Sequence, residues 1–458
     1  MSPRTRQAVI VATDFLLILL AYLLAYYVRF HGAIPHRNFV PFPVLGPLLA
    51  LLGVLLLTTY ETHRDLHREP FDTYASLALA VTMATALGLT LPYVFGAPAF
   101  PRSVFLIAAP LQFALLSASR WPWIAAARRA FRERRFIVVG ATAEDAATLA
   151  RLVRGSFGAV HVLALTAAEA ADAFAAPAAV TEPDADAVFV GPHASPELRL
   201  AAQSWALARG RQFYAVPSLY DILMLRSQST RVGDLPVIGA RPPEIPPDYA
   251  WLKRLVDVAG ALLLGAATAP VLALAAAAIA LTSPGPVLYR QTRVGLHGRP
   301  FTIYKLRTMR VDAEAETGPT LATADDPRVT PVGRWLRALR LDELPQVWNV
   351  LRGDMSLVGP RPERPEFVRA FEAQLPHYRL RHNVRPGLTG LAQVMAAYST
   401  DAEEKLRYDL TYIMQASPLL DLKILFLTVR AVLLPGRAGA FPAWAREAAG
   451  PVVKSVNR

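Results

Sequence analysis

The chain of 458 residues contains no cysteine and has few charged residues. Without cysteine, disulfide bonds, thiolate nucleophiles and cysteine-ligated metal sites are excluded. Charged residues make up 18% of the chain and hydrophobic residues 53%, a balance too apolar for an ordinary soluble enzyme. The composition therefore indicates a membrane protein.

Histidine offers no convincing metal site either, because the nine histidines form no ligand pair in a catalytic context. His63 and His67 have the i, i+4 spacing, but they lie in a short segment between apolar stretches, which favours a solvated loop. Basic residues outnumber acidic ones by 48 to 36, which gives a net charge of +12. Such an excess suits nucleic acid, an anionic membrane surface or a phosphorylated substrate. The apolar composition favours the last two, so we expect no nucleic-acid partner.

Four apolar stretches occupy the first quarter of the chain, and each approaches the ~20 residues that cross a bilayer as a helix. They cover residues 8–28, 42–60, 74–95 and 103–122. Basic clusters stand before the first stretch, between the second and third, and after the fourth: Arg4, Arg6, Arg64, Arg68, Arg128, Arg129, Arg132, Arg134 and Arg135. Because basic residues mark cytoplasmic loops, residues 1–130 are predicted to form a four-helix transmembrane bundle with a cytoplasmic N-terminus. A buried helical bundle in a soluble protein fits these basic flanks less well.

Residues 136–235 alternate between strand-like and helix-like patterns, which predicts a small Rossmann-like α/β module with a parallel sheet. The expected strands are 136–140, 160–165 and 187–190, and the expected helices are 146–153 and 197–209. The turn at 140–143 lacks the second and third glycines that bring a dinucleotide close to the backbone. We therefore favour a structural or regulatory module, with a membrane-anchored NAD-dependent nucleotide-sugar dehydratase or epimerase as the alternative. The proline-rich segment 236–249 is interpreted as a linker.

Residues 255–281 form a further apolar stretch, whose only charged residue is Asp257. The stretch is long enough to cross a bilayer, but Pro270 in its middle removes a backbone donor and kinks a helix. Basic residues flank both ends: Lys253, Arg254, Arg290 and Arg293. A helix that dips into the membrane and returns keeps both flanks in the cytoplasm, so we expect a re-entrant helix rather than a fifth span.

The segment 283–397 is rich in arginine, glycine and proline, a composition that suits phosphate-binding loops. Two strands at 287–293 and 301–305 are predicted to form a hairpin. Four basic residues lie on it or next to it: Arg290, Arg293, Lys305 and Arg307. Three more arginines follow with the spacing of one helical face: Arg334, Arg337 and Arg340.

Two adjacent carboxylates, Asp342 and Glu343, follow this basic region. Proline is tolerated in the first turn of a helix, so Pro345 lets a helix start near Asp342, where the N-terminus favours an ionised carboxylate. One carboxylate could attack phosphorus as a nucleophile while the other helps to hold a divalent metal. A plainer alternative, with Asp342 as a helix cap and Glu343 as its solvated neighbour, fits the spacing equally well.

A series of ordered motifs extends over this region of the chain. They are SPGPV (283–287), RQTRVG (290–295), FTIYKLRTM (301–309), DPRVT (326–330), LDELPQVWNV (341–350), GDMSLVGPRPERPE (353–366), RPGLTGLAQV (385–394) and EKLRYD (404–409). Residues 250–435 thereby resemble the bacterial sugar transferases of the polyprenyl-phosphate hexose-1-phosphate transferase family. The whole layout, with four spans and a soluble module before these motifs, resembles the larger subgroup of that family, which initiates exopolysaccharide or O-antigen synthesis.

This resemblance implies that residues 250–440 form a monotopic catalytic α+β domain that transfers a sugar 1-phosphate from a UDP-sugar to undecaprenyl phosphate. Asp342 matches a nucleophile that displaces UMP and forms an aspartyl intermediate, and Glu343 matches a carboxylate that, with Asp342, would hold Mg²⁺. Arg337 is expected to hold the polyprenyl phosphate, and Arg361 the nucleotide phosphates. Further candidates for substrate binding are Lys305, Arg307 and Arg293.

The resemblance also implies a bacterial inner-membrane protein whose catalytic domain lies at the cytoplasmic face, and a chain of this layout is expected to form a homodimer. Family members often have serine before the helix-breaking proline, where this chain has Ala269 before Pro270. Residues 419–434 fit either a helix on the membrane surface or a packed core helix, and 441–458 fit a loosely ordered tail. A non-catalytic polysaccharide assembly protein, whose arginines bind only lipid headgroups, is a further alternative. The sequence does not reveal which sugar is transferred.

Overall fold

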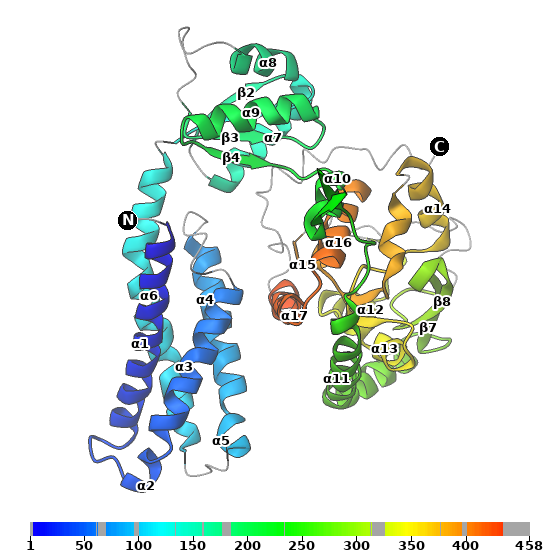
Figure 1. Cartoon of the computed structure of the whole chain (residues 1–458). Coiled ribbons are helices and arrows are strands. Elements are labelled where there is room, and N and C mark those ends of the chain that lie inside the picture. Colours follow the sequence, from blue (N-terminus) through cyan, green and yellow to red (C-terminus); the bar gives the residue numbers. More distant parts are fainter. Residues whose placement is uncertain are drawn as a thin grey trace. The chain divides into compact units, whose positions relative to one another are not determined.

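The computed structural model describes residues 3–60, 62, 70–95, 100–132, 134–157, 160–175, 185–232, 234–311, 313, 326–375, 377–395 and 401–433. The chain divides into two compact units near Val216. The first unit contains a helical bundle and an α/β module, and the second contains the segments that carry the sequence motifs (Figure 1). His63, His67 and the predicted tail 441–458 lie outside the described residues.

Four helices form the N-terminal bundle at the positions of the four apolar stretches (Figure 1). They are α1 (Pro3–Arg29), α3 (Phe42–Thr59), α4 (Pro70–Gly88) and α6 (Arg102–Arg132), with the short helices α2 (His36–Phe39) and α5 (Leu91–Val94) between them. Helices α1 and α4 each pack against both α3 and α6. By length and composition α1, α3 and α6 can cross a membrane, whereas the apolar part of α4, Thr73–Gly88, is shorter.

An ion pair lies buried inside this bundle, between α1 and α6. The guanidinium of Arg120 donates two hydrogen bonds to the carboxylate of Asp14, one of them 2.8 Å long, and both side chains are fully buried. Because a charge within a membrane span is costly unless it is paired, Arg120 explains how the apolar helix α1 can carry Asp14. Glycine allows close packing nearby, where Gly53 of α3 faces Ile18 of α1.

A parallel four-stranded sheet in the order β2-β1-β3-β4 forms the α/β module. Its elements are β1 (Arg135–Val139), α7 (Ala143–Phe157), β2 (His161–Leu165), α8 (Ala167–Ala175), β3 (Ala187–Val190), α9 (Pro196–Ala208) and β4 (Gln212–Ala215). Helix α7 covers one face, where Leu149 packs on Phe136 and Val138. Helices α8 and α9 cover the other face, where Trp205 packs with Ile137. The predicted parallel unit is therefore present, and β4 and α8 are elements that the sequence pattern did not reveal.

The second unit begins with short elements. They are α10 (Leu219–Leu223), the 3-10 helix η1 (Met224–Arg226) and an antiparallel hairpin of β5 (Gln228–Val232) and β6 (Leu235–Gly239). The linker prediction for 236–249 is wrong, because β6 occupies its first residues and a long helix begins at Pro247. Pro236 is tolerated in β6 because both strands of a two-stranded hairpin are edge strands.

The motif-bearing part of the second unit combines small sheets with short helices. Its elements are the hairpin β7 (Leu288–Val294) and β8 (Pro300–Leu306) with η2 (Leu296–Gly298) at its turn, α12 (Pro331–Ala338), η3 (Leu341–Gln346), α13 (Val347–Arg352), β9 (Ser356–Val358), α14 (Pro365–Gln374), η4 (Tyr378–Asn383), β10 (Gly387–Thr389), α15 (Leu391–Met395), α16 (Ala402–Gln415) and α17 (Pro418–Leu433). The predicted hairpin is confirmed, with Leu288 opposite Leu306 and Val294 opposite Pro300. Strands β9 and β10 form a separate parallel pair.

The apolar stretch 255–281 lies within α11 (Pro247–Thr282), a single helix of 36 residues with Pro270 inside it. The first half of α11 contacts β9, where Gly260 faces Leu357. The second half contacts α12, and Ile279 packs there. Several leucines on the rest of the helix are exposed: Leu255, Leu262, Leu263, Leu274 and Leu281. The helix therefore lies against the motif-bearing core at both ends and presents an apolar surface outward.

Helix α17 occupies the stretch for which two placements were open. Ile424 and Leu427 are buried, whereas Leu419 is 73% exposed and Leu433 is 60% exposed. One face of α17 is thus packed in the core, as one of the two interpretations expected. Contact of the exposed leucines with a membrane surface, the other interpretation, stays a prediction.

Candidate active site

The carboxylate pair lies in a tight connection between α12 and α13. Thr330 caps α12 by accepting a hydrogen bond of 3.0 Å from the backbone amide of Gly333. The helix ends at Ala338, and Arg340 has a left-handed backbone with φ 56°. Asp342 and Glu343 then lie in the 3-10 helix η3, and the regular α13 begins only at Val347. A helix therefore starts near Asp342 as predicted, but it is a 3-10 helix, and Asp342 is not its N-cap.

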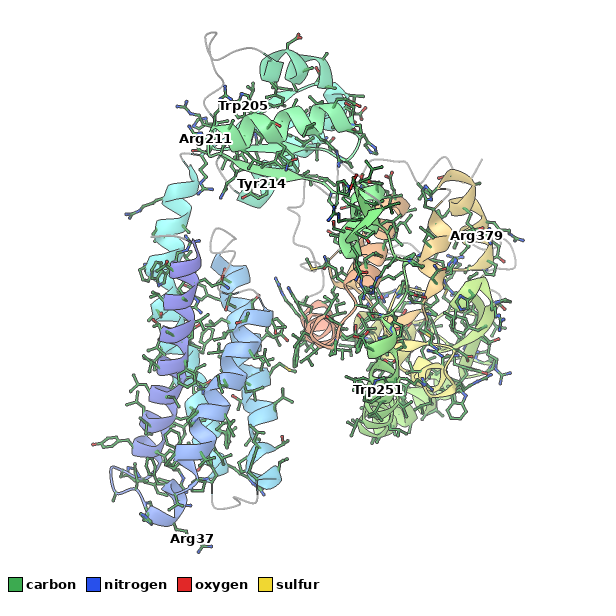
Figure 2. All side chains as sticks on the ribbon, viewed as in Figure 1. Arg37, Trp205, Arg211, Tyr214, Trp251 and Arg379 are labelled. Carbon is green, nitrogen blue, oxygen red and sulfur yellow. The ribbon has the colours of Figure 1, made fainter. Side chains whose placement is uncertain are left out.

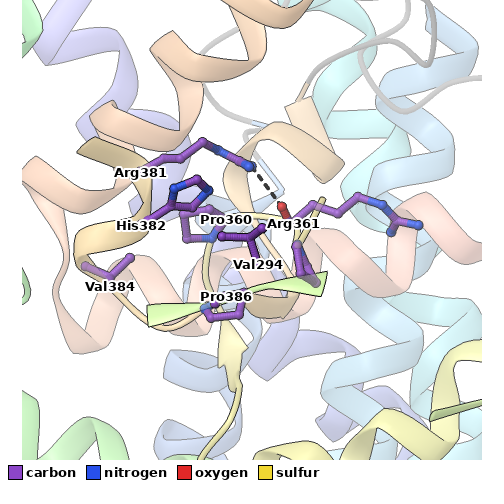
Figure 3. A pocket seen from close by; sticks show the side chains of 9 residues that line it. Val294, Pro360, Arg361, Arg381, His382, Val384 and Pro386 are labelled. Atoms are coloured by element: carbon purple, nitrogen blue, oxygen red, sulfur yellow. Dashed lines mark hydrogen bonds between the residues drawn. The ribbon is translucent and has the colours of Figure 1, made fainter. Parts of the chain in front are cut away.

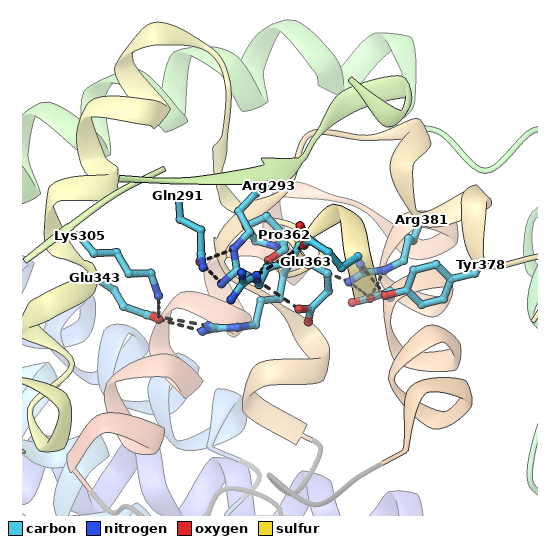
Figure 4. A network of polar contacts seen from close by, with 12 residues as sticks. Gln291, Arg293, Lys305, Glu343, Pro362, Glu363, Tyr378 and Arg381 are labelled. Atoms are coloured by element: carbon cyan, nitrogen blue, oxygen red, sulfur yellow. Dashed lines mark hydrogen bonds and ion pairs between the residues drawn. The ribbon is translucent and has the colours of Figure 1, made fainter. Parts of the chain in front are cut away.

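Glu343 is held by two cations from separate segments. Its Oε1 atom lies 2.8 Å from Nζ of Lys305 on β8 and 2.9 Å from a guanidinium nitrogen of Arg361. Figure 4 shows Lys305 and Glu343 pointing toward each other. Burial alone would raise the pKa of Glu343, but Arg361 and Lys305 outweigh burial and hold this pKa well below its ordinary value. Glu343 is thus an ionised, paired carboxylate rather than the solvated neighbour of the plainer alternative.

Asp342 has a different environment, although it is the next residue. Its side chain is buried, with 8% of the residue exposed. Among the residues that the structure describes, no hydrogen bond or ion pair reaches its carboxylate. Burial and then the charge of Glu343 raise the pKa of Asp342, against the opposing effects of Lys305, Arg337 and Arg340. Two adjacent carboxylates with opposite pKa shifts suit two different chemical tasks.

Arg337 faces the pair from α12. Its Nε atom donates a hydrogen bond of 2.9 Å to Oγ1 of Thr308, just after β8, and this bond orients the guanidinium. The positive charge acts on Asp342 and also on Asp326, whose pKa is lowered to about 2, chiefly by hydrogen bonds from Arg328. The structure therefore brings Arg337, Lys305 and Arg361 to the carboxylate pair, as the sequence analysis expected of substrate ligands.

Arg307 and Arg293 make contacts of another kind. The guanidinium of Arg307 is buried and donates to the carbonyl oxygens of Ser283 (2.7 Å) and Pro284 (2.6 Å), at the end of α11. Arg293 donates to Oε1 of Gln291 and to the carbonyl of Pro362. These arginines hold the exit of α11 and the loop beside Arg361, so the contacts favour a positioning role over a direct contact with substrate.

A buried cluster behind Arg361 was not found from the sequence. Arg381 on η4 donates to the backbone carbonyl of Arg361 at 2.8 Å, to Oδ2 of Asp409 on α16 at 2.6 Å, and to the hydroxyl of Tyr378 at 3.1 Å. Arg381 is 5% exposed and Asp409 is 2% exposed. Asp409 lies in a recognised motif, but a pairing across 28 residues of sequence leaves no local signal. The cluster fixes the backbone of Arg361, whose side chain binds Glu343.

A small cavity lies beside this cluster (Figure 3). Val294, Pro360 and Pro386 form apolar parts of its wall, and His382 is buried next to them, where its Nε2 atom has no hydrogen bond to any described residue. Burial and then Arg381 lower the pKa of His382 to about 4, so this imidazole is neutral near pH 7. The neutral ring adds no charge to the carboxylate pair and serves as packing for the Arg361 loop.

The first half of α11 is tied to the same core by buried polar groups. Lys253 lies 2.5 Å from the carboxylate of Asp421 on α17. Asp257 accepts hydrogen bonds from the amide of Leu357 (2.9 Å) and the hydroxyl of Ser356 (3.0 Å). At the end of α13, the guanidinium of Arg254 donates hydrogen bonds to the carbonyls of Val350 and Leu351 at 2.7 and 2.9 Å. The basic residues that were interpreted as a cytoplasmic flank therefore bind protein groups.

The described residues of the α/β module form no comparable site. Where a parallel sheet of this kind would bind a ligand, at the carboxyl ends of its central strands, Arg199 of α9 donates to the carbonyls of Gly191, Pro192 and Val216. The first turn of α7 carries the acidic residues Glu144 and Asp145, which disfavour a bound phosphate. These contacts count against the dinucleotide-enzyme alternative and favour a structural or regulatory module.

A carboxylate pair next to basic side chains, on a core that carries an exposed apolar helix, is an arrangement that suits phosphoryl transfer at a membrane. A family model described as bacterial sugar transferase matches residues 248–435. A UDP-glucose:undecaprenyl-phosphate glucose-1-phosphate transferase from Caulobacter vibrioides is 52% identical over 193 residues, which cover 41% of this chain and 71% of that protein. The chain belongs to the bacterial sugar transferase family.

Other relatives match over a smaller share of their length. A UDP-N-acetylgalactosamine-undecaprenyl-phosphate N-acetylgalactosaminephosphotransferase from Aeromonas hydrophila is 46% identical over 41% of this chain and 45% of its own length. The UDP-glucose:undecaprenyl-phosphate glucose-1-phosphate transferase of Escherichia coli K12 is 41% identical over 47% of each protein. The matching region thus spans about half the length of these two relatives, and the activities in their names involve different sugars.

Proposed function

We propose that this chain transfers a sugar 1-phosphate from a UDP-sugar to undecaprenyl phosphate, releases UMP and thereby initiates synthesis of a bacterial polysaccharide. The observation that carries the proposal is the pair Asp342 and Glu343, in which Glu343 is bound by Lys305 and Arg361 while none of the described residues forms a hydrogen bond or ion pair with Asp342. A buried carboxylate that lacks a partner but lies among cations is suited to attack an electrophilic phosphorus. The activities named for the relatives support the same reaction.

In the first step of the proposed reaction, a carboxylate oxygen of Asp342 attacks the β-phosphorus of the UDP-sugar. The bond from that phosphorus to the oxygen bridging the two phosphates breaks, and UMP leaves with the bonding electrons. The sugar 1-phosphate is then esterified to Asp342. In the second step a phosphate oxygen of undecaprenyl phosphate attacks the same phosphorus, and the Asp342 carboxylate is released. The covalent route splits one difficult displacement into two easier ones.

Charge neutralisation is the main task of the surrounding residues, because two anionic substrates must meet a carboxylate. Lys305 and Arg361 lie within 2.9 Å of the carboxylate of Glu343, the residue that follows Asp342. Arg337, oriented by Thr308, adds a third positive group. These side chains lower the energy of the negative charge that develops on the transferred phosphate.

The two carboxylates also fit a bound Mg²⁺. No group of three or more histidine, aspartate or glutamate side chains gathers in the described ranges. Mg²⁺ commonly uses one or two carboxylates and completes its coordination with water and substrate phosphates, so the donor pair Asp342 and Glu343 is sufficient. Mg²⁺ held there would offset the phosphate charge and polarise the bond to the leaving UMP.

Release of UMP by the purified full-length chain is the direct test, measured with UDP-glucose and UDP-N-acetylgalactosamine in the presence of Mg²⁺. The Asp342→Asn variant is expected to lose both UMP release and transfer to undecaprenyl phosphate. Glu372→Gln, which alters a partly exposed carboxylate on α14, is the matched control and is expected to keep both. Full transfer by Asp342→Asn would refute the covalent mechanism, and absence of UMP release by the unaltered chain with both sugars would refute the activity for those substrates.

We further propose that α11 enters the membrane and returns to the same side, and that the catalytic core and N-terminus lie in the bacterial cytoplasm at the inner membrane. Contacts at both ends of α11 with one compact core support this path. Because the chain lacks cysteine, single cysteines at the exposed positions Asp248 and Arg290 can be labelled in sealed vesicles without a background. Labelling from the same side supports the re-entrant helix, and labelling from opposite sides refutes it. A homodimer is part of the same proposal and is tested by mass measurement in nanodiscs.

A further inference from the structure

Arg340 has an unusual backbone for its residue type. Its φ of 56° and ψ of 19° place it in the left-handed region, at the junction of α12 and η3. Glycine, asparagine and aspartate adopt this region at lower cost than a long side chain, so arginine is an unfavourable choice for the turn alone. A costly backbone state next to a reactive group commonly reflects a functional need of the side chain.

The Arg340 side chain is exposed and belongs to the carboxylate site electrostatically. Within the described part of the chain it forms no hydrogen bond or ion pair. Its charge nevertheless acts on Asp342, two residues later, in the same direction as the charge of Arg337. Arg340 therefore presents, close to the proposed nucleophile, a guanidinium that is not paired with any of the described side chains.

An exposed apolar surface adjoins this arginine. On α12, Leu336 is buried and packs with Ile279 of α11, whereas Trp335 is 74% exposed and Leu339 is 54% exposed. Helix α11 itself has the length and composition of a membrane segment and carries further exposed apolar side chains, among them Trp251, labelled in Figure 2. Tryptophan and arginine together are typical of the level where lipid headgroups meet the acyl chains.

We propose that Arg340 binds the phosphate group of the lipid acceptor, undecaprenyl phosphate, as a second guanidinium beside Arg337. This inference rests on the proposed function and adds a residue to the acceptor site. The lipid phosphate reaches Asp342 from the membrane, and Arg340 lies where the apolar surface of α12 meets η3. Lys305 and Arg361 bind Glu343, so the UDP-sugar is assigned to their side of the pair. A planar guanidinium matches the oxygens of a phosphate with paired hydrogen bonds.

The test separates the two half-reactions of the full-length chain in nanodiscs. Arg340→Asn removes the charge while keeping a residue that tolerates a left-handed backbone, and Arg340→Lys keeps the charge. For Arg340→Asn we expect the KM for undecaprenyl phosphate to rise about tenfold, as for loss of a charge-assisted hydrogen bond. Because the charge of Arg340 lowers the pKa of Asp342, single-turnover UMP release is compared at a high pH, where Asp342 is ionised in both proteins, and is expected to stay unchanged there. Arg340→Lys is expected to recover part of the loss. Arg334→Gln, an exposed arginine of α12 that is not among the charges acting on Asp342, is the control and is expected to behave as the unaltered chain.

Two results would overturn the assignment. The first is an unchanged KM for undecaprenyl phosphate in Arg340→Asn, which would show that Arg340 does not bind the acceptor. If association with anionic vesicles weakens at the same time, Arg340 is a general contact for lipid headgroups. A matching loss in UMP release would place Arg340 on the UDP-sugar side. Equilibrium binding of radiolabelled undecaprenyl phosphate gives a readout without turnover. If the unaltered chain binds undecaprenyl phosphate through Arg340 but releases no UMP, the proposed function is refuted and the acceptor contact of Arg340 is retained.

Discussion

The buried pair of Arg381 and Asp409 allows stability and positioning to be separated in one set of variants. Asp409→Asn removes the only carboxylate that the structure pairs with Arg381 among the described residues and leaves a guanidinium charge buried at 5% exposure. Removal of one partner from a buried pair costs about 3–5 kcal/mol, so the melting temperature of the full chain in detergent is expected to fall by several degrees. Replacement of both charges by apolar side chains of similar size is often neutral, so Arg381→Met combined with Asp409→Leu should regain most of this loss.

Activity is expected to follow a different course in the double variant. Arg381 also donates to the carbonyl of Arg361 at 2.8 Å, and that bond is absent once Arg381 is replaced. A hydrogen bond from a charged donor contributes about 1.5–3 kcal/mol, which corresponds to roughly 10- to 100-fold in rate if it is expressed in the transition state. UMP release by the double variant should therefore remain low although its stability has recovered. Recovery of UMP release together with stability would refute the positioning role, and an unchanged melting temperature in Asp409→Asn would refute the energetic reasoning.

Three further outcomes follow from the described contacts. Arg307→Ala leaves the carbonyls at the end of α11 without their donor and should lower the melting temperature by an amount equivalent to about 1–3 kcal/mol. UMP release should fall while the KM for the UDP-sugar stays nearly unchanged, and a large rise of this KM alone would show that Arg307 binds the substrate. Asp14→Ala leaves Arg120 unpaired and should lower the melting temperature, and Asp14→Ala with Arg120→Leu should recover it; no loss in the single variant would contradict the pairing. Burial and the charge of Glu343 raise the pKa of Asp342, so the ionised Asp342 destabilises the folded chain above that pKa. Asp342→Asn removes this charge and should raise the melting temperature at pH 8 with EDTA present. The gain should vanish as the pH falls below the pKa of an unfolded aspartate, and a gain that is independent of pH would show another cause.

Periodicity and hydropathy were sufficient for the elements with strong patterns. The apolar helices α1, α3, α6 and α11 and the hairpin β7–β8 lie where the sequence placed them. Weakly patterned elements were missed, because β4 has only four residues, Gln212–Ala215, and most of them are exposed. The linker prediction failed because proline suggested a break, whereas a two-stranded hairpin leaves Pro236 an edge position.

The carboxylate pair could be predicted because Asp342 and Glu343 are adjacent in sequence, but its geometry could not. The 3-10 form of η3 and the left-handed Arg340 occur between α12 and α13, which both contact α11, and such tertiary contacts have no local signal in the sequence. The bond between Arg381 and the carbonyl of Arg361 is likewise beyond a sequence pattern, because a backbone acceptor has no residue type. The sequence therefore indicates candidate reactive groups more readily than the groups that position them.

Arginine density is the clearest case of a signal with two physical origins. The sequence interpretation assigned these arginines to phosphate, yet Arg254, Arg307 and Arg381 direct their guanidinium groups at backbone carbonyls. A carbonyl at the end of a helix has partial negative charge and two lone pairs, so an arginine fork satisfies it as it would satisfy a phosphate oxygen. These bonds join α11, α13 and the Arg361 loop into one body, so that the apolar helix and the carboxylate pair keep a fixed relation. Among the described residues no carbonyl engages the guanidinium groups of Arg337 and Arg340, which lie near Asp342, so we assign these two to the acceptor phosphate and keep Lys305 and Arg361 for the UDP-sugar. A charge-removing change in Arg337 or Arg340 should weaken acceptor binding more than folding.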